Sequence, residues 1–336
     1  MSAVATPRQY TDPSVGLVAK SGDNITSRWG FPEWFIVSQT FIPALLFIPG
    51  SQVVRLPLRV APFAISLLAL AWRMMNGVKE ERPHPARPWL LLAVAYLVLM
   101  IFHPTTNTTL AGIAQMLLYL SVMAPLFWVP SLMRGPQHLG RLLILLLICS
   151  GVNAAVGVMQ VYDPDRWMPP EISRAVAGNR YGRDYYTYVG PDGKRIVRPP
   201  GLFDTPGAVA APGAVAGLLG LVFFLGPIPL WKKALALCFA AAGAIAIYLS
   251  NVRTSILILA GMLFVYFVLL LIQRQRAKAI AFGALAVLLF SITLSYSIFI
   301  GGKSINERFA TLFEDAPVNV YFKAGRGDQL RHGFMV

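Results

Sequence analysis

Charged residues are scarce in this sequence of 336 residues. Asp, Glu, Lys and Arg make up 13% of it, against 56% hydrophobic residues, whereas an ordinary soluble domain has about 25% charged residues. So few charges cannot cover a water-facing surface, which excludes a soluble enzyme. Aromatic residues make up 12% and apolar runs recur along the chain, which excludes an intrinsically disordered protein. The sequence therefore predicts an all-α, polytopic membrane protein, in keeping with its mean hydropathy of +0.60.

Acidic residues and cysteines are also few. There are 15 acidic residues against 29 Lys and Arg, for a net charge of +14, and two cysteines. Because Cys149 and Cys238 both lie in apolar runs, they predict neither a disulfide framework nor a metal cluster. We interpret the basic excess as a membrane-topology signal and an attraction for anionic lipids or phosphate groups, and not as a nucleic-acid surface.

Long apolar runs divide the chain into membrane spans. A bilayer needs roughly 20 apolar residues per helix, and the third of the runs is short, between two prolines. The nine predicted spans cover residues 33–50, 56–73, 88–103, 109–130, 141–161, 207–226, 231–250, 254–272 and 279–300. The sequence thus predicts a cytoplasmic tail at 1–32, a transmembrane domain at 33–300 with a long outer loop at 162–206, and an outer-face tail at 301–336.

Basic residues in the short loops predict the orientation of these spans. With the N-terminus in the cytoplasm, the inner segments contain most of the basic residues outside the long loops, and the short outer loops contain Arg55, Arg59 and Arg253. Since cytoplasmic loops are enriched in Lys and Arg, we expect residues 162–206 and 301–336 to lie outside.

The spans lack charged residues near their centres. Proton- or ion-coupled transporters usually place such residues at the membrane midplane, so a coupled transporter is disfavoured. The histidines form no pair inside the membrane, which disfavours a haem or quinone site. We interpret His84, His103 and His138 as solvated residues in loops or at helix ends.

The outer loop has the composition of an ordered segment. Residues 162–206 contain seven basic residues, six acidic residues and five tyrosines. A Gly-Pro-Asp-Gly turn at 190–193 between aromatic and β-branched residues predicts a β-hairpin. Loops longer than about 15 residues are usually functional or disordered. We therefore expect either a packing cap over the helices or an aromatic and cationic groove for a sugar–phosphate substrate.

The end of this loop contains a candidate anion site. We expect Asp204 or Thr205 to cap the next helix, with Pro206 in its first turn. A helix N-terminus attracts anions, and Arg198 lies just upstream of it. The small residues at 213, 217 and 220 in that helix predict close helix packing.

Two more arginines are candidates for anion binding. Arg253 follows a very short outer turn, so it must either snorkel to the interface or meet an anion there. A capping box at 304–307 predicts a short amphipathic helix on the outer membrane face, and this helix contains Arg308.

Together, these motifs resemble the bacterial O-antigen ligase/polymerase superfamily. The resemblance covers roughly residues 30–325 and rests on the order and placement of short motifs. They are Arg198-x-x-Gly201-x-Phe203-x-x-Pro206 before an apolar helix, Leu249-Ser250-x-x-Arg253-Thr254 at a helix junction, and Glu307-Arg308-Phe309 after the next hairpin.

The resemblance implies a glycosyltransferase of the bacterial inner membrane. The donor would be a glycan on a polyprenyl-pyrophosphate carrier in the outer leaflet, and the acceptor another carrier-linked glycan or lipid A–core. Membrane lipids would surround the protein, and the reaction would need no metal or other cofactor. Arg198, Arg253 and Arg308 would then bind the pyrophosphate. No catalytic base stands out, although Asp204 and Glu171 are nearby candidates.

Family members usually continue beyond the point where this chain stops, so we expect the chain to be truncated at its C-terminus. Two alternatives remain at the level of the sequence. A lipid-linked glycan flippase or exporter would more often have a charged central cavity and about 12–14 helices. A non-catalytic membrane scaffold would fit a chain without its catalytic part.

Overall fold

A computed structural model describes residues 29–76, 86–103, 108–133, 135–168, 186–189, 193 and 195–301. Most of the predicted cytoplasmic tail and almost the whole of the predicted outer-face tail lie outside these residues. The capping box at 304–307, Arg308 and Glu171 lie outside them as well.

Each of the nine predicted spans coincides with helix. The helices are α1 (Phe31–Ala44), α2 (Arg55–Met75), α3 (Arg87–Met100), α4 (Thr109–Met123) with α5 (Pro125–Leu132), α6 (Pro136–Tyr162), α10 (Ala210–Phe224), α11 (Leu230–Ser250), α12 (Arg253–Ile272) and α13 (Arg276–Gly301). Among the described residues, six helices are long and apolar enough to cross a membrane, counting α4 and α5 as one, and the shorter apolar helices are Phe31–Phe47, Arg87–Met100 and Ala210–Phe224. The chain therefore has the architecture of a multi-pass membrane protein.

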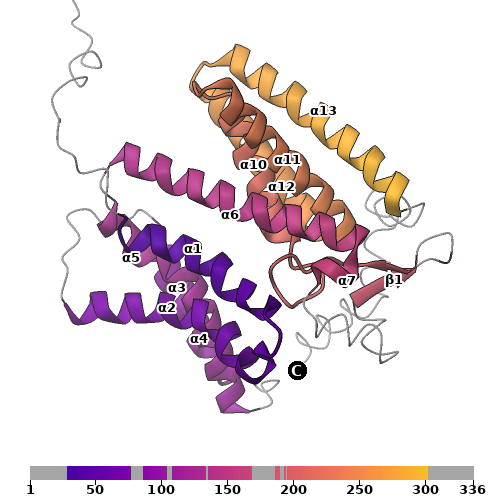
Figure 1. Cartoon of the computed structure of the whole chain (residues 1–336). Helices are drawn as coiled ribbons and strands as arrows, with labels where there is room; N and C mark the ends of the chain where they lie inside the picture. Colours follow the sequence, from indigo (N-terminus) through magenta and orange to yellow (C-terminus); the bar gives the residue numbers. More distant parts are fainter. Residues whose placement is uncertain are drawn as a thin grey trace, which may run out of the picture.

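The helices form two groups on either side of α6 (Figure 1). The first bundle, α1 to α5, packs against α6 through α1. The second bundle consists of α6 itself with α10 to α13, and α6 packs there against α10 and α11. Helix α6 is thus the element shared by both halves of the molecule.

Close packing of α10 on α11 confirms the prediction made from the small residues. A Cβ on Gly213 would stand 2.8 Å from the carbonyl oxygen of Gly243, and one on Gly220 would stand 2.4 Å from that of Ala236. Since real Cβ atoms do not approach carbonyl oxygens so closely, larger side chains would push the two helices apart.

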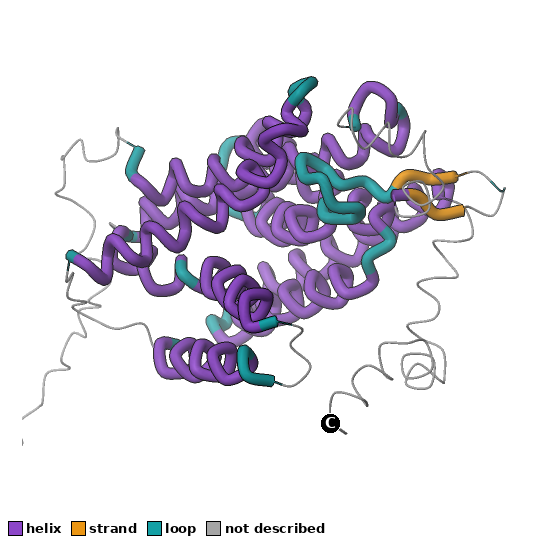
Figure 2. Tube along the Cα trace, turned by 90° about the horizontal axis from the view of Figure 1, so that it is seen from below, coloured by secondary structure: helices purple, strands orange, loops and turns teal. Residues whose placement is uncertain are grey.

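The predicted hairpin is also present. Strand β1 (Thr187–Val189) pairs antiparallel with β2 (Arg195–Val197), with Thr187 opposite Val197 and Val189 opposite Arg195. Figure 2 shows the hairpin leading into the loop before α10, at one end of the helices. Met168, Tyr186 and Val197 form a small buried apolar cluster there. This part of the long loop is therefore ordered.

Polar contacts join helix ends that the predicted topology assigns to the same side of the membrane. We call the end with the hairpin the loop face; there the side chains of Tyr162 and Tyr296 are in contact, and Asp204 contacts the start of α2. At the opposite face, the first turns of α1 and α6 are in contact. These contacts agree with the predicted alternation of spans, and the assignment of the opposite face to the cytoplasm stays a prediction.

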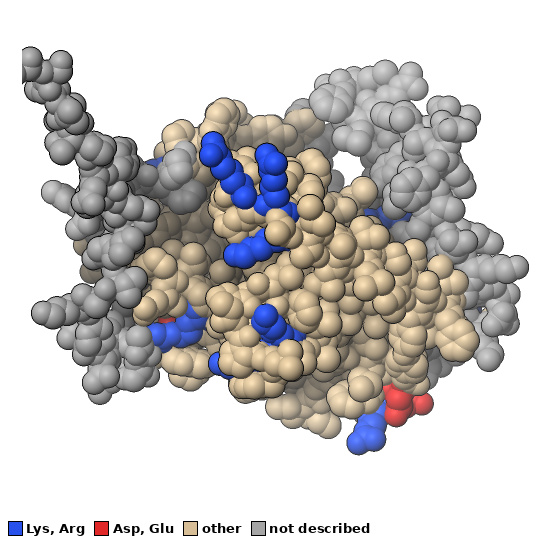
Figure 3. Space-filling view, turned by 90° about the horizontal axis from the view of Figure 1, so that it is seen from above, with Lys and Arg blue, Asp and Glu red and all other residues tan. Residues whose placement is uncertain are grey.

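The visible surface of the bundle has few charges. Figure 3 shows a largely uncharged face on which a few basic side chains gather toward one side. Large apolar side chains are exposed along the first bundle and along α12 and α13. A lipid environment would cover such a surface, whereas water would not.

Candidate functional site

The loop that joins β2 to α10, residues 198–209, is fixed by two buried amide side chains of α6. Gln160 donates a hydrogen bond from Nε2 to the carbonyl oxygen of Gly201 at 2.8 Å, and its Oε1 accepts one from the Gly201 amide at 2.9 Å. The Oδ1 atom of Asn153 accepts a hydrogen bond from the Leu202 amide at 3.1 Å. The sequence reasoning missed both amides, although buried amides seven residues apart lie on one face of a helix.

Gly201 is required at the centre of these contacts. Its φ is +67°, and a Cβ there would stand 2.0 Å from Asn153 Oδ1. Any other residue would combine a left-handed backbone with a steric clash. The Gly201 position of the motif therefore has a local structural reason.

Arg198 lies where this loop meets the junction between α11 and α12. Its amide donates to the Tyr186 carbonyl oxygen at 2.7 Å, so the backbone is anchored to the hairpin. A Cβ on Gly207 would lie 3.8 Å from Arg198 Nη2, 3.3 Å from the Ser250 carbonyl oxygen and 2.9 Å from Val252 Cγ2. The guanidinium group and the junction are therefore neighbours across Gly207.

The Nε atom of Arg198 is buried and has no hydrogen-bond partner among the residues that the structure describes. A buried donor without a partner costs about 1–3 kcal/mol, more when charged. An external acceptor at this position would remove that cost.

The α11–α12 junction is as short as predicted. Asn251, with φ +60°, and Val252 are its two residues, and Arg253 begins α12 with a half-buried side chain. The Ser250 hydroxyl accepts a hydrogen bond from the Val252 amide at 3.3 Å, which fixes the turn. The Oδ1 atom of Asn251 is buried and has no hydrogen-bond partner in the described part of the chain. The structure thus brings Arg198 to the segment that contains Arg253, and Arg308 lies outside the described residues.

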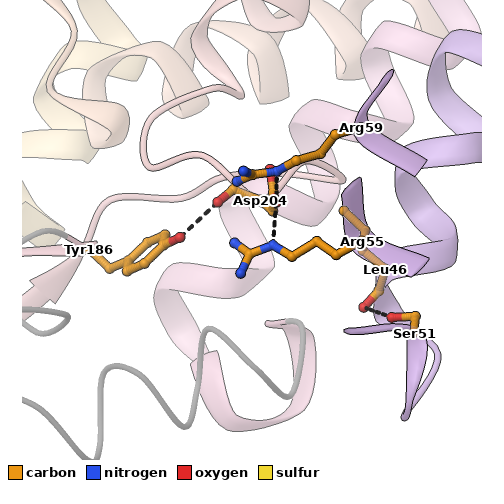
Figure 4. Close-up of polar contacts among 6 residues, drawn as sticks. All are labelled: Leu46, Ser51, Arg55, Arg59, Tyr186 and Asp204. Atoms are coloured by element: carbon orange, nitrogen blue, oxygen red, sulfur yellow. Dashed lines mark hydrogen bonds and ion pairs between the residues drawn. The ribbon is translucent and has the colours of Figure 1, made fainter. Parts of the chain in front are cut away.

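Asp204 does not cap the following helix as predicted. Helix α10 begins at Ala210, its N-cap is Val209, and no side chain caps it. The carboxylate of Asp204 instead accepts hydrogen bonds on Oδ2 from the Nε atoms of Arg55, at 2.9 Å, and Arg59 (Figure 4). The prediction was wrong because Asp204 forms ion pairs with two arginines of α2. Hydrogen bonds between two charged groups are stronger than one from a neutral helix amide.

These ion pairs keep Asp204 ionised. Burial would raise the pKa of this carboxyl, but the hydrogen bonds from Arg59 and Arg55 outweigh burial and lower it. The Tyr186 hydroxyl donates to the Asp204 carbonyl oxygen at 2.8 Å, which fixes the backbone as well. A carboxylate with a lowered pKa is a weak base, so Asp204 is better suited to positioning the loop than to general-base catalysis.

Arg55 and Arg59 are functional candidates that the sequence reasoning noted for topology alone. They are four residues apart at the start of α2, so they lie on one face of the helix. Nothing in the local sequence links them to Asp204, which follows Arg59 by 145 residues. Among the described residues, no cluster of three or more His, Cys, Asp or Glu is placed to bind a metal ion.

At the opposite face, His138 is not the solvated residue that we expected. It is buried in the first turn of α6, with Nε2 3.0 Å from Glu33 Oε1. Arg141 Nη1 lies 3.5 Å from the same oxygen, and Glu33 also accepts a hydrogen bond from the Gly30 amide at 2.9 Å. The buried carboxylate of Glu33 attracts both basic groups, and the cluster joins α1 to α6.

An apolar cavity of about 390 Å³ lies among α11, α12 and α13. Its lining includes Ile247 and Tyr248, within one turn of the α11–α12 junction, and Phe264 and Val287, whose side chains are mostly exposed on the surface of the bundle. An apolar space next to a polar helix junction suits a molecule with both an apolar and a polar part.

Comparisons with protein-family models, with curated proteins and with solved structures found no match to this chain. The function is therefore argued from the residues and their geometry.

Proposed function

We propose that this chain is a glycosyltransferase of the bacterial inner membrane that transfers or polymerises a glycan from a polyprenyl-pyrophosphate carrier. The observation that supports it most is the position of Arg198, whose buried Nε lacks a partner, beside the segment that contains Arg253. The acceptor would be another carrier-linked glycan or lipid A–core. The N-terminus would be cytoplasmic and the loop face would be periplasmic.

In this reaction an acceptor hydroxyl attacks the anomeric carbon of the donor glycan. The bond from that carbon to the phosphate oxygen breaks, the polyprenyl pyrophosphate leaves with the electron pair, and the hydroxyl proton passes to a base. Arg198 and Arg253 bind the diphosphate and neutralise the charge that develops on it, as electrostatic catalysis requires. Arg308 is proposed as a third ligand.

The cavity supports a lipid-linked donor. Tyr248 lines the cavity, and the junction that begins after Ser250 is less than one helical turn away. A carrier with its diphosphate at Arg198 and Arg253 would therefore have an apolar space for its prenyl chain close by. A soluble nucleotide sugar has no group that needs such a space.

Deletion of the gene in its host, followed by gel analysis of surface polysaccharide, tests the proposal. Loss of long chains from lipid A–core, with carrier-linked polymer retained, identifies a ligase, and single-repeat products identify a polymerase. Lipid-linked repeats that stay on the cytoplasmic leaflet would identify a flippase instead. Surface polysaccharide of unchanged length and amount would contradict the proposal.

A further inference from the structure

Basic side chains are concentrated where the second bundle reaches the face opposite the loop face. Leu225, Leu270 and Ala279, at the ends of α10 and α12 and the start of α13, belong to one apolar cluster, and these ends lie together at the top of the second bundle in Figure 1. We call the charged surface there the basic patch. It consists of Lys232 and Lys233 at the start of α11, Arg274 in the α12–α13 turn, and Arg276 and Lys278 at the start of α13.

The basic patch has no counter-ion in the described part of the chain. None of its side chains forms an ion pair with a carboxylate there. Lys233 is half-buried and the other four residues are exposed. Neither α11 nor α13 has an acidic residue in its first turn, although the helix dipole favours acidic residues at this end and disfavours basic ones. The patch therefore concentrates positive charge that the described protein does not neutralise.

Arg274 occupies a backbone position that favours glycine. Its φ is +59°. The Gln275 amide donates to the Leu270 carbonyl oxygen and the Arg274 amide to that of Leu271, both at 2.9 Å. Helices that end in this pattern usually have glycine at the left-handed position, because a Cβ is unfavourable there. The exposed side chain of Arg274 forms no hydrogen bond or ion pair with the described residues, so no such contact offsets that cost. An anion outside the protein would offset it.

Exposed apolar side chains flank the basic patch. Leu230 and Trp231 precede the two lysines, and Ile272 and Ile280 lie beside the cations of the α12–α13 turn; all four are mostly exposed. The Nζ atom of Lys232 lies 5.3 Å from the centre of the Trp231 ring. Tryptophan and basic residues are typical of the membrane–water interface, where apolar chains and charged headgroups meet one protein surface.

We propose that the basic patch binds the headgroups of anionic phospholipids. Phosphate oxygens accept charge-assisted hydrogen bonds from guanidinium and ammonium groups. A lipid also covers the flanking apolar side chains, which a soluble anion does not. The proposal does not depend on glycosyl transfer, because the patch lies at the opposite face from Arg198 and Arg253.

The test is native mass spectrometry of the full chain in a neutral detergent, titrated with dioleoyl phosphatidylglycerol. Dioleoyl phosphatidylcholine, which has the same chains and no net charge, is the matched ligand. Arg166→Gln is the control, because it removes an exposed arginine at the loop face. Thermal unfolding checks that each variant is folded. The variants are Lys232→Gln/Lys233→Gln, Arg276→Gln/Lys278→Gln and Arg274→Gly.

We expect phosphatidylglycerol to bind the wild-type protein more tightly than phosphatidylcholine does. Each basic residue removed should weaken phosphatidylglycerol binding about fivefold, and each double variant about 25-fold, since one basic residue contributes about 1 kcal/mol to binding of an anionic lipid. Arg166→Gln should bind like the wild type. Equal phosphatidylglycerol binding by all variants would overturn the site. A loss in Arg166→Gln as large as that in Arg274→Gly would overturn its confinement to this face.

Arg274→Gly separates lipid binding from folding. Because glycine adopts the left-handed backbone without strain, this variant should melt at the wild-type temperature or above it, while it binds phosphatidylglycerol about fivefold more weakly. A lower melting temperature together with unchanged lipid binding would show that the side chain serves the fold and would contradict its role in the patch. Displacement of phosphatidylglycerol by millimolar inorganic phosphate, with equal binding of both lipids, would overturn the lipid as the source of the anion.

Discussion

Two pairs of arginines at the loop face differ in their counter-ions. Arg55 and Arg59 share the carboxylate of Asp204. Among the described residues, Arg198 has a buried Nε without a hydrogen-bond partner, and Arg253 forms no ion pair with a carboxylate. Both pairs surround the same loop, residues 198–209, but the first pair has an internal anion and the second does not.

This difference indicates a division of roles. Cations that already have a protein carboxylate stabilise the fold and connect the first bundle to the loop. Cations without one remain costly until an external anion arrives, which is how binding sites for anionic substrates are built. This difference is the reason for the proposal that Arg198 and Arg253 bind the diphosphate and that Asp204 positions the loop.

The largest effect is expected when the unpaired arginines are changed. Arg198→Lys and Arg253→Lys keep the charge and lose the bidentate fork. Product formation should fall roughly 10²–10³-fold, as it does when a donor that stabilises the transition state is lost. The measurement is surface polysaccharide in a deletion strain complemented at matched expression.

Arg59→Lys and Arg166→Lys are the controls for these two variants. Arg59→Lys preserves an ion pair with Asp204, and Arg166 lies on the same face outside any motif, so both should retain most of the product. If all four variants behaved alike, the distinction between the two pairs of arginines would be lost.

A smaller effect is expected from the scaffold of the loop. Gly201→Ala should lower the free energy of unfolding by about 2–4 kcal/mol, because the left-handed backbone and the clash with Asn153 Oδ1 add together. Gly193→Ala is a matched control, since Gly193 has φ +70° and nothing within 4 Å of a Cβ. It should cost about 1 kcal/mol. Equal losses of stability on thermal unfolding would show that the α6 amides do not restrain the loop.

The ion pair of Asp204 should contribute less. Because both arginines are partly exposed, Asp204→Asn should destabilise the protein by about 1–2 kcal/mol at pH 7. The pKa of Asp204 is lowered from 3.8, so this stabilisation is present above that value and is lost as the pH falls through the folded-state pKa. Wild type and Asp204→Asn should therefore converge in thermal stability toward pH 2. A constant difference from pH 7 to pH 2 would assign the effect to something other than the ion pair.

The topology prediction involves no change in stability. In a chain lacking Cys149 and Cys238, Val189→Cys in the hairpin should react with a membrane-impermeant thiol reagent in cells whose outer membrane is permeabilised. Gln273→Cys, at the exposed end of α12, should not. Val189 is a better position than its buried neighbour Thr187. The reverse labelling pattern would place the loop face in the cytoplasm.

The helices and the hairpin could be predicted because their signals are local. Apolar runs of sufficient length predict membrane helices, and the Gly-Pro-Asp-Gly turn predicts a hairpin wherever the segment lies in the fold. The partners of Asp204 and His138 could not be predicted in this way. Asp204 meets residues at the start of α2, and His138 meets Glu33 from 105 residues earlier, so local capping and loop rules gave the wrong environment for both. The predicted start at 207 failed because the left-handed Gly207 delays α10 to Ala210.

The most direct test of the assignment of the diphosphate is the affinity of the purified chain in nanodiscs for a polyprenyl pyrophosphate without a glycan. We predict that Arg198→Gln and Arg253→Gln each weaken this binding at least tenfold, about the value of one lost charge-assisted hydrogen bond, while Arg166→Gln leaves it unchanged. The corresponding polyprenol, which has no phosphate, should bind all four proteins equally. Equal affinity of the wild type and the Arg198 and Arg253 variants for the polyprenyl pyrophosphate would contradict the account.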